Sequence, residues 1–309
     1  ILYFTGSLNI TYTFSDYGFE EMVFLAGSGP ATPPPPPPPP VPVVMTGTAG
    51  ANTLIGNATA DIINGLAGND TLAGNGGDDV LNGGAGNDRM DGGSGIDTAS
   101  YEDAGSAVTV SLAVASAQVT GGSGRDTLAG FENLRGSAYG DTLTGSSAAN
   151  TIEGLAGNDR LDGGMGADIL IGGNGDDQYV VDNAGDVVNE SGTNGTDTVL
   201  SSVSFSLADG SHVLGLVENL TLTGAAHANA TGNSGNNLLS GNAGNNILDG
   251  GDGTDTVSYA DSARGVTANL ALATAQAAAT GLGSDTLLNI ENVTGSNLGD
   301  VLTGSAGNN

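Results

Sequence analysis

Residues 47–100 read GTAGANTLI-GNATADIIN-GLAGNDTLA-GNGGDDVLN-GGAGNDRMD-GGSGIDTAS, which are six consecutive nonapeptides. Each begins with Gly, has Asp or Asn at its sixth position and an apolar residue at its eighth. A second array covers 136–180 and a third covers 232–258. Single copies surround four further aspartates, Asp126, Asp197, Asp285 and Asp300. Such self-similarity at a fixed short period is the sequence signature of a solenoid.

The nonapeptide itself predicts the geometry of one coil. Its glycines let the backbone turn with positive φ at little steric cost. The last three residues suffice for a short strand, in which neighbours point to opposite faces, so the eighth residue faces inward. Two turns and two strands close one coil, which therefore spans two nonapeptides and stacks Asp61 below Asp79 and Asp79 below Asp97. We therefore predict an all-β fold with no long helix anywhere in 46–309.

Composition narrows the partners of the chain. The 309 residues hold 34 Asp and Glu against 5 Arg and Lys, a formal net charge of −29, and no Cys. A polyanion cannot neutralise phosphates, so nucleic acid is excluded, and anionic membrane surfaces are excluded with it. Insertion into a membrane is not expected either, because a membrane-spanning helix needs about 20 apolar residues in a row.

Stacked aspartates call for a cation. Coils of a parallel solenoid lie ~4.8 Å apart. Two carboxylates at that spacing repel by about 3 kcal/mol at an effective dielectric of 20. Oxygen ligands without His or Cys favour calcium over zinc or copper, and calcium accepts irregular shells that magnesium does not. The sequence therefore predicts several bound Ca²⁺ ions.

The copies GGAGNDRMD (83–91), GGMGADILI (163–171) and GGDGTDTVS (250–258) resemble the RTX, or hemolysin-type, calcium-binding repeat of the glycine-rich nonapeptide family. The resemblance covers about 46–309. It implies a right-handed parallel β-roll of nine-residue half-coils with calcium between turns one coil apart. It also implies the ligands: carbonyls from positions 2 and 4 with the aspartate of one turn, and carbonyls from positions 1 and 3 with the aspartate of the next.

Carried onto this sequence, the resemblance predicts five complete ligand sets. The first array supplies three: Asn57, Thr59 and Asp61 with Gly74, Gly76 and Asp79; Leu66, Gly68 and Asp70 with Gly83, Ala85 and Asp88; and Asn75, Gly77 and Asp79 with Gly92, Ser94 and Asp97. The second array supplies two: Ser137, Tyr139 and Asp141 with Gly154, Ala156 and Asp159; and Leu155, Gly157 and Asp159 with Gly172, Asn174 and Asp177. The further predicted calcium ligands are Asp126, Asp168, Asp255, Asp285 and Asp300.

Asparagine replaces the aspartate at several sixth positions. An amide oxygen can ligate calcium but brings no charge, so we expect weak or empty sites there. The positions are Asn52, Asn150, Asn237, Asn246 and Asn309.

The rest of the chain divides by composition. Residues 1–29 are expected to be the tail of an upstream β-rich region, and 30–45 a polyproline linker. Residues 46–309 form the predicted roll, interrupted by strand segments near 101–120, 181–228 and 259–279. The motif Glu-Asn-Leu or Glu-Asn-Val, at Glu132, Glu218 and Glu291, is expected to be structural.

No catalytic constellation is visible, since no G-x-S-x-G elbow occurs and His212 and His227 are isolated. The chain is therefore not expected to be an enzyme. We expect a calcium-binding structural or interaction module of a secreted or cell-surface protein, such as a stalk, adhesin or surface-layer element. It would fold on binding calcium outside the cell, after the bacterial type I export that the family uses. Its candidate partners are other copies of itself and polysaccharide of the cell surface or matrix.

The alternative is the C-terminal RTX carrier region of a secreted protease, lipase or polysaccharide-modifying enzyme. Its catalytic domain would lie outside this sequence.

Overall fold

A computed structural model describes residues 40–191, 194–278 and 281–309. The upstream β-rich region and most of the polyproline linker lie outside these ranges. Residues 40–309 form one compact unit. The described residues contain 30 short strands and no helix, as the nine-residue period predicts. No helix of the described chain could cross a membrane.

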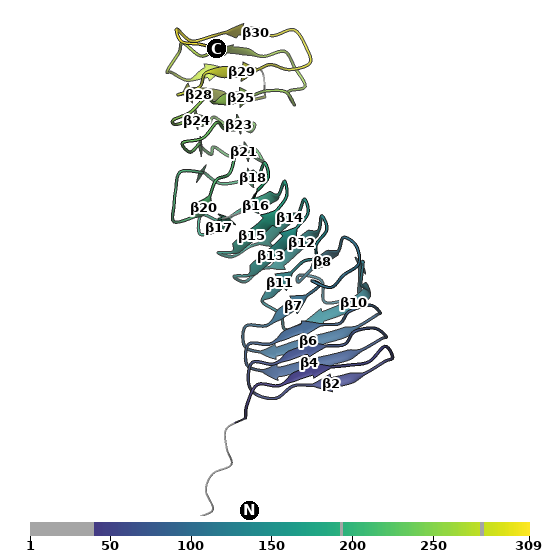
Figure 1. The fold of residues 1–309 in the computed structure, drawn as a ribbon. Coiled ribbons are helices and arrows are strands. Elements are labelled where there is room, and N and C mark those ends of the chain that lie inside the picture. Colours follow the sequence, from purple (N-terminus) through teal and green to yellow (C-terminus); the bar gives the residue numbers. More distant parts are fainter. Residues whose placement is uncertain (1–39, 192–193, 279–280) are drawn as a thin grey trace, which may run out of the picture. The chain divides into compact units, whose positions relative to one another are not determined.

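Two long sheets and two short ones contain nearly all the strands (Figure 1). The first long sheet has the order β1 (Val44–Thr46), β3 (Ile62–Asn64), β5 (Val80–Asn82), β7 (Thr98–Ser100), β11 (Asn133–Arg135), β13 (Thr151–Ala156), β15 (Ile169–Asn174), β17 (Val187–Glu190), β20 (Val213–Gly215). The first short sheet has the order β2 (Thr53–Ile55), β4 (Thr71–Gly76), β6 (Arg89–Ser94), β10 (Gly124–Ala129), β9 (Gln118–Gly121).

The other half repeats this plan. The second long sheet has the order β8 (Thr109–Ser111), β12 (Thr142–Ser146), β14 (Arg160–Gly164), β16 (Gln178–Val181), β18 (Thr198–Ser201), β21 (Asn219–Leu222), β23 (Leu238–Ser240), β25 (Thr256–Ser258), β29 (Asn292–Thr294). The second short sheet has the order β19 (Phe205–Ser206), β22 (Ala230–Thr231), β24 (Ile247–Asp249), β28 (Ser284–Leu288), β27 (Gln276–Ala277). β26 (Thr267–Asn269) pairs with β30 (Val301–Thr303).

The strands pair in parallel with the predicted period. Leu54 aligns with Leu72 and Ile63 with Leu81, which is an offset of two nonapeptides in each case. Only two pairs among the described strands are antiparallel, β9 with β10 and β27 with β28. The prediction of a parallel β-roll is therefore confirmed, and its sheets are open rather than closed.

The eighth residues of the repeats form the core, as predicted. In the first two arrays, apart from the half-buried Leu54, they are at most 1% exposed. They stack directly on one another through the parallel register, so each coil buries its apolar side chain against its two neighbours. These residues are Ile63, Leu72, Leu81, Met90, Ala99, Leu143, Ile152, Leu161, Leu170 and Tyr179.

At the interrupting segments one sheet of the roll ends and another begins. The β9–β10 pair ends the first short sheet, while β8 begins the second long sheet against β12. The β27–β28 pair ends the second short sheet in the same way, and β26 pairs with β30. Gln118 hydrogen-bonds both backbone groups of Ser111, and Gln276 does the same to Asn269. The two interruptions are thus copies of one structural unit.

Candidate metal centres

The sixth-position aspartates form ladders along the edges of the roll. In each ladder the Oδ1 atom of one aspartate accepts a hydrogen bond from the backbone N–H of the aspartate one coil earlier. The N–O distance is 2.7 Å from Asp61 to Asp79, 2.8 Å from Asp79 to Asp97, and 2.7 Å from Asp70 to Asp88. The second array repeats the pattern, at 2.7 Å from Asp141 to Asp159 and 2.8 Å from Asp159 to Asp177.

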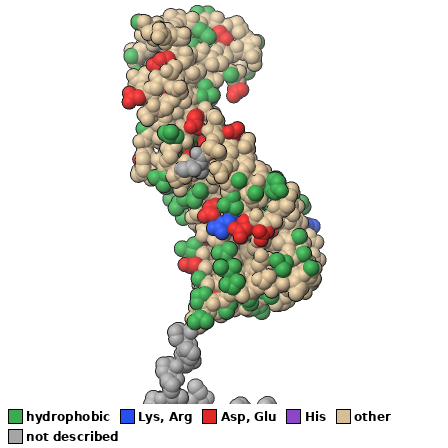
Figure 2. Space-filling view, viewed as in Figure 1, with side chains coloured by type: hydrophobic (Ala, Val, Ile, Leu, Met, Phe, Trp, Pro, Cys, Tyr) green, Lys and Arg blue, Asp and Glu red, His purple; other side chains and the backbone are tan. Residues whose placement is uncertain are grey.

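The other oxygen, Oδ2, is free in a defined subset of these aspartates. It is buried and finds no hydrogen-bond partner within the described part of the chain. Few carboxylates reach the face shown in Figure 2, in keeping with this burial. A buried carboxylate oxygen without a partner is unfavourable unless a cation lies beside it. The eight aspartates are Asp70, Asp79, Asp88, Asp97, Asp159, Asp168, Asp177 and Asp255.

The turn before each of these eight aspartates has a left-handed residue at its second position. Three of the eight are not glycine: Leu66 with φ 74°, Asn75 with φ 74° and Leu155 with φ 82°. Left-handed backbone is costly for an L-residue, and such strain tends to persist at functional sites. We call these turns open. The other five carry Gly84, Gly93, Gly164, Gly173 and Gly251.

The remaining turns of the three arrays, and the turn at 304–309, are closed. Here the second residue is not left-handed, and its N–H donates to the side chain at the sixth position of the same turn. The N–O distance is 2.6 Å from Asn57 to Asp61 and 2.7 Å from Asn233 to Asn237. The second residue of a closed turn is Ser, Thr or Asn. Each closed turn is the first of its stack, because no repeat turn lies one coil earlier. Their second residues are Thr48, Asn57, Ser137, Ser146, Asn233, Asn242 and Ser305.

Each open turn therefore marks one gap between two stacked repeat turns. All five predicted ligand sets fall in such gaps and end on an open turn, at Asp79, Asp88, Asp97, Asp159 or Asp177. The other three gaps end on Asp70, Asp168 and Asp255, and each follows an asparagine: Asn52, Asn150 or Asn237.

Oxygens from both coils converge in these gaps. A Cβ atom placed on Gly65 would lie 2.5 Å from Asp70 Oδ2 and 2.7 Å from the Gly83 carbonyl oxygen. The same two kinds of oxygen border Gly56, at 2.5 Å for Asp61 Oδ2 and 2.7 Å for the Gly74 carbonyl. Only glycine fits at the first position, because the space beside its Cα is lined by ligand-type oxygens. The donor set is carboxylate and carbonyl alone, which fits calcium.

Several predicted carbonyl ligands also bind the neighbouring coil. The Leu66 carbonyl accepts from Ala85 N–H at 2.7 Å, and the Ala85 carbonyl accepts from Gly68 N–H at 2.9 Å. A carbonyl oxygen has two lone pairs, so one remains available for a cation. The same holds for the carbonyls of Asn57, Ser94 and Asn174. Ligation by these residues remains a prediction.

Burial makes the ladder carboxylates hard to ionise without a cation. It raises the pKa of Asp159 to about 7 and those of Asp88 and Asp97 to about 6. The negative charge of neighbouring ladder residues adds to the effect, while the hydrogen bond from the preceding coil opposes it. A bound divalent cation would favour the ionised forms.

The isolated aspartates differ from the ladder. Asp126 uses both oxygens, accepting from Asp88 N–H at 2.9 Å and from Thr120 Oγ1 at 3.0 Å. Asp285 accepts from Asn246 N–H at 3.1 Å. Asp300 accepts from Ser296 Oγ and Val266 N–H, and these hydrogen bonds lower its pKa.

The Glu-Asn motif supplies ladder steps that the nonapeptide template missed. Glu132 Oε2 accepts from Asp97 N–H at 2.9 Å, Glu218 Oε2 from Asp197 N–H at 2.9 Å, and Glu291 Oε2 from Asp255 N–H at 2.8 Å. The glutamate thus stands where the next aspartate would be. Recurrence of the motif was the sequence signal.

One coil after two of these glutamates, the ladder position is an asparagine, and the hydrogen bonds give a physical reason. Asn150 Nδ2 donates to the Glu132 carbonyl at 2.6 Å, and Asn237 Nδ2 donates to the Glu218 carbonyl at 3.1 Å. Aspartate could not donate here. These asparagine side chains therefore link successive coils by hydrogen bonds, in addition to being uncharged.

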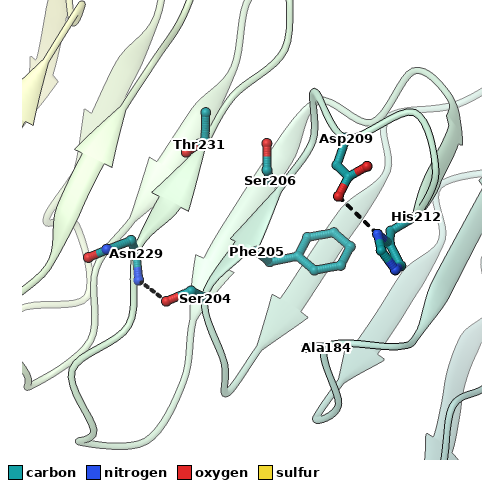
Figure 3. A pocket seen from close by; sticks show the side chains of 8 residues that line it. All are labelled: Ala184, Ser204, Phe205, Ser206, Asp209, His212, Asn229 and Thr231. Carbon is teal, nitrogen blue, oxygen red and sulfur yellow. Dashed lines mark hydrogen bonds and ion pairs between the residues drawn. The ribbon is translucent and has the colours of Figure 1, made fainter.

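A pocket lies within 184–231, and its lining includes Phe205, Asp209 and His212 (Figure 3). Its cavity volume is ≈ 290 Å³, and Asp209 Oδ2 lies 2.9 Å from His212 Nδ1. The Ser211 hydroxyl lies 3.0 Å from the same ring nitrogen. A Ser-His-Asp relay needs the serine on the other nitrogen, so this arrangement does not form one.

Comparison with known families gives the class of these repeats. The family model described as "RTX calcium-binding nonapeptide repeat (4 copies)" matches residues 44–72, 64–99, 128–154, 144–179 and 229–261. These stretches of the roll therefore consist of RTX calcium-binding nonapeptide repeats, which are structural calcium-binding repeats rather than catalytic ones. A comparison with curated proteins finds no match.

Proposed function

We propose that the chain is a calcium-dependent folding module of a secreted or cell-surface protein. The observation that carries this proposal is the correspondence between the eight open turns and the eight aspartates with an unpartnered, buried Oδ2. Calcium in the gaps supplies the missing partner and offsets the repulsion within each ladder.

The eight gaps are not equivalent as calcium sites. The five gaps with an aspartate on both sides provide two carboxylates each, and we propose that these bind calcium before the other three. The three that follow Asn52, Asn150 and Asn237 provide one, so calcium is weaker there. Neighbouring sites share aspartates, Asp79 and Asp159 among them, so filling one gap orders the turn used by the next. Folding is therefore cooperative in calcium.

The location follows from the calcium supply. Extracellular calcium modules typically bind with Kd of about 10⁻⁴ to 10⁻³ M. At cytosolic calcium such sites stay empty and the ladders repel, which keeps most of the roll unfolded for export. A stalk, adhesin or surface-layer role suits a module whose repeats only bind ions and stack. The alternative, a carrier region of a secreted enzyme, calls for a catalytic domain elsewhere in the protein.

The test is a calcium titration of the 309-residue chain followed by circular dichroism, with chelator as the reverse arm. At neutral pH we expect chelator to remove most, but not all, of the β-structure, and calcium to restore it cooperatively. A β spectrum that chelator leaves unchanged would contradict the proposal. Magnesium at equal concentration is the matched control and should not replace calcium.

A further inference from the structure

Three buried carboxylates meet at the end of the second array, and two of them, Glu190 and Asp197, lie outside the predicted ligand sets. One carboxylate oxygen each from Asp177, Glu190 and Asp197 lie within 4.8 Å of one another. Their residues are only 1%, 4% and 3% exposed. No Arg or Lys of the described residues forms an ion pair with Asp177 or Asp197. Asp197 and Glu190 share a side-chain hydrogen bond, so the cluster holds a proton when no cation is bound, and a cation would take the place of that proton.

Asp177 gives an independent sign that a ligand belongs there. Its Oδ1 accepts from Asp159 N–H at 2.8 Å, whereas its Oδ2 is buried without a hydrogen-bond partner in the described chain. Asp197 continues the ladder, because its Oδ1 accepts from Asp177 N–H at 2.9 Å. In the ladder an Oδ2 atom faces the following coil, as Asp159 Oδ2 does beside the Gly172 carbonyl, so Asp177 Oδ2 faces the step that leads to Asp197 and Glu190.

Glu190 occupies a position that the repeat otherwise gives to glycine. Asn189 aligns with Ile171 in the parallel register, so Glu190 corresponds to Gly172 one coil earlier. At Gly172 an added Cβ would strike Asp177 Oδ2 and the Tyr179 hydroxyl. Four residues separate Gly172 from Asp177, whereas six separate Glu190 from Asp197. The longer turn accompanies the larger side chain.

We propose that Asp177, Glu190 and Asp197 form a three-carboxylate calcium site that is tighter than the two-carboxylate gaps of the arrays. The proposal rests on the proposed function, because it assumes that the ladders bind calcium. The oxygen-only donors select a hard cation, and the irregular arrangement suits calcium better than magnesium. A third carboxylate raises affinity, since calcium affinity follows ligand charge. This site fills first and orders the coil after the second array.

The test compares Glu190→Gln with the wild-type chain by calorimetric calcium titration. In wild type we expect one calcium to bind at least tenfold more tightly than the others, which is about 1.4 kcal/mol. In Glu190→Gln that event joins the weaker class and the other sites keep their affinities. Glu190→Gly, which restores the glycine of the repeat, should behave alike. Glu102→Gln, in an exposed ion pair with Arg135, is the matched control and should leave the isotherm unchanged.

Thermal unfolding separates a calcium ligand from a carboxyl group that only shares a proton. Glu190→Gln should be less stable than wild type in calcium and more stable in chelator, because repulsion among the three carboxyl groups falls. Array binding with an isotherm unaltered by Glu190→Gln would overturn this site alone. A wild-type chain that binds no calcium would overturn both this site and the proposed function.

Discussion

Some gaps have an aspartate on both sides, and others begin with an asparagine. The two kinds have the same backbone arrangement but are stabilised by different interactions. In the gap from Asp61 to Asp79 two carboxylates face one another, and Asp79 Oδ2 has no partner in the described chain. In the gap from Asn237 to Asp255 the lower rung is an amide that donates to the Glu218 carbonyl at 3.1 Å. The first kind needs a cation, and the second is partly satisfied by the protein itself. The roll therefore combines calcium-dependent steps with hydrogen-bonded ones.

Removal of calcium should produce the largest difference between the two kinds of gap. In chelator we expect amides of 47–100 and 136–180 to lose most of their protection from hydrogen exchange. Amides of 238–249, which follow the closed turn of Asn237 and include the closed turn of Asn246, should lose less protection. Exchange followed by mass spectrometry gives both numbers in one experiment. Equal loss in the three regions would mean that asparagine steps depend on calcium as strongly as aspartate steps.

Substitution of a single rung should come next in size. In calcium, Asp79→Ala should lower the free energy of unfolding by roughly 2–4 kcal/mol, because it removes a charged hydrogen bond and a ligand of two predicted sites. Asp61→Ala should lose less, since Asp61 belongs to one site.

In chelator the order should reverse. Asp61 accepts from Val43 N–H at 2.8 Å and Asn57 N–H at 2.6 Å, so its loss still leaves donors unpaired. Asp79 accepts from one backbone donor, Asp61 N–H at 2.7 Å, and its buried Oδ2 has no partner in the described chain, so its removal should cost less than the removal of Asp61. Denaturant unfolding under both conditions measures this, and an unchanged order would argue against calcium in the Asp61–Asp79 gap.

The reverse exchange, Asn237→Asp, should destabilise by roughly 1–3 kcal/mol, the usual effect of unpairing buried polar groups. Asn237 Nδ2 donates to the carbonyls of Val217 and Glu218, at 3.2 Å and 3.1 Å, and a carboxylate would face both without a proton to give. Asn52→Asp is the matched control, because Asn52 donates to the exposed hydroxyl of Thr48 instead. If Asn237→Asp is stabilising in calcium, the position is a calcium rung that only lacks charge.

Much of this arrangement follows from sequence, but the state of each turn does not. The period of two nonapeptides and the inward eighth residue place Leu72, Leu81 and the aspartate ladders correctly. Local propensity would put Asn57 in the left-handed region before Leu66, yet Leu66 is the left-handed one. What decides is a repeat turn one coil earlier, which Leu66 has and Asn57 lacks. That contact is tertiary, and residue type alone does not reveal it, because Asn is the second residue of both the closed turn of Asn57 and the open turn of Asn75.

The pH dependence in chelator should be smaller and of defined sign. Burial raises the pKa of Asp159 to about 7 and that of Asp168 to about 6, above the unfolded value near 3.9. The folded state then binds more protons than the unfolded state, so stability is present at low pH and is lost as pH rises through 6 to 7. Thermal unfolding in chelator should show a higher midpoint at pH 5 than at pH 8. In calcium the trend should flatten or invert, because protons compete with the cation.

The smallest effect should come from the strained turn itself. Leu66 is 43% exposed with φ 74°, so Leu66→Gly removes left-handed strain of about 1–2 kcal/mol and little buried surface. We expect a net gain of up to about 1 kcal/mol in calcium, after the greater flexibility of glycine in the unfolded chain is offset. Asn57→Gly, at the same position of a closed turn, relieves no strain and loses the Nδ2 hydrogen bond to the Val41 carbonyl at 2.9 Å, so it should destabilise. Opposite signs for these two variants would show that open and closed turns differ in backbone strain as well as in aspartate partners. A loss of stability in both would mean that the Leu66 side chain contributes more to the fold than its exposure indicates.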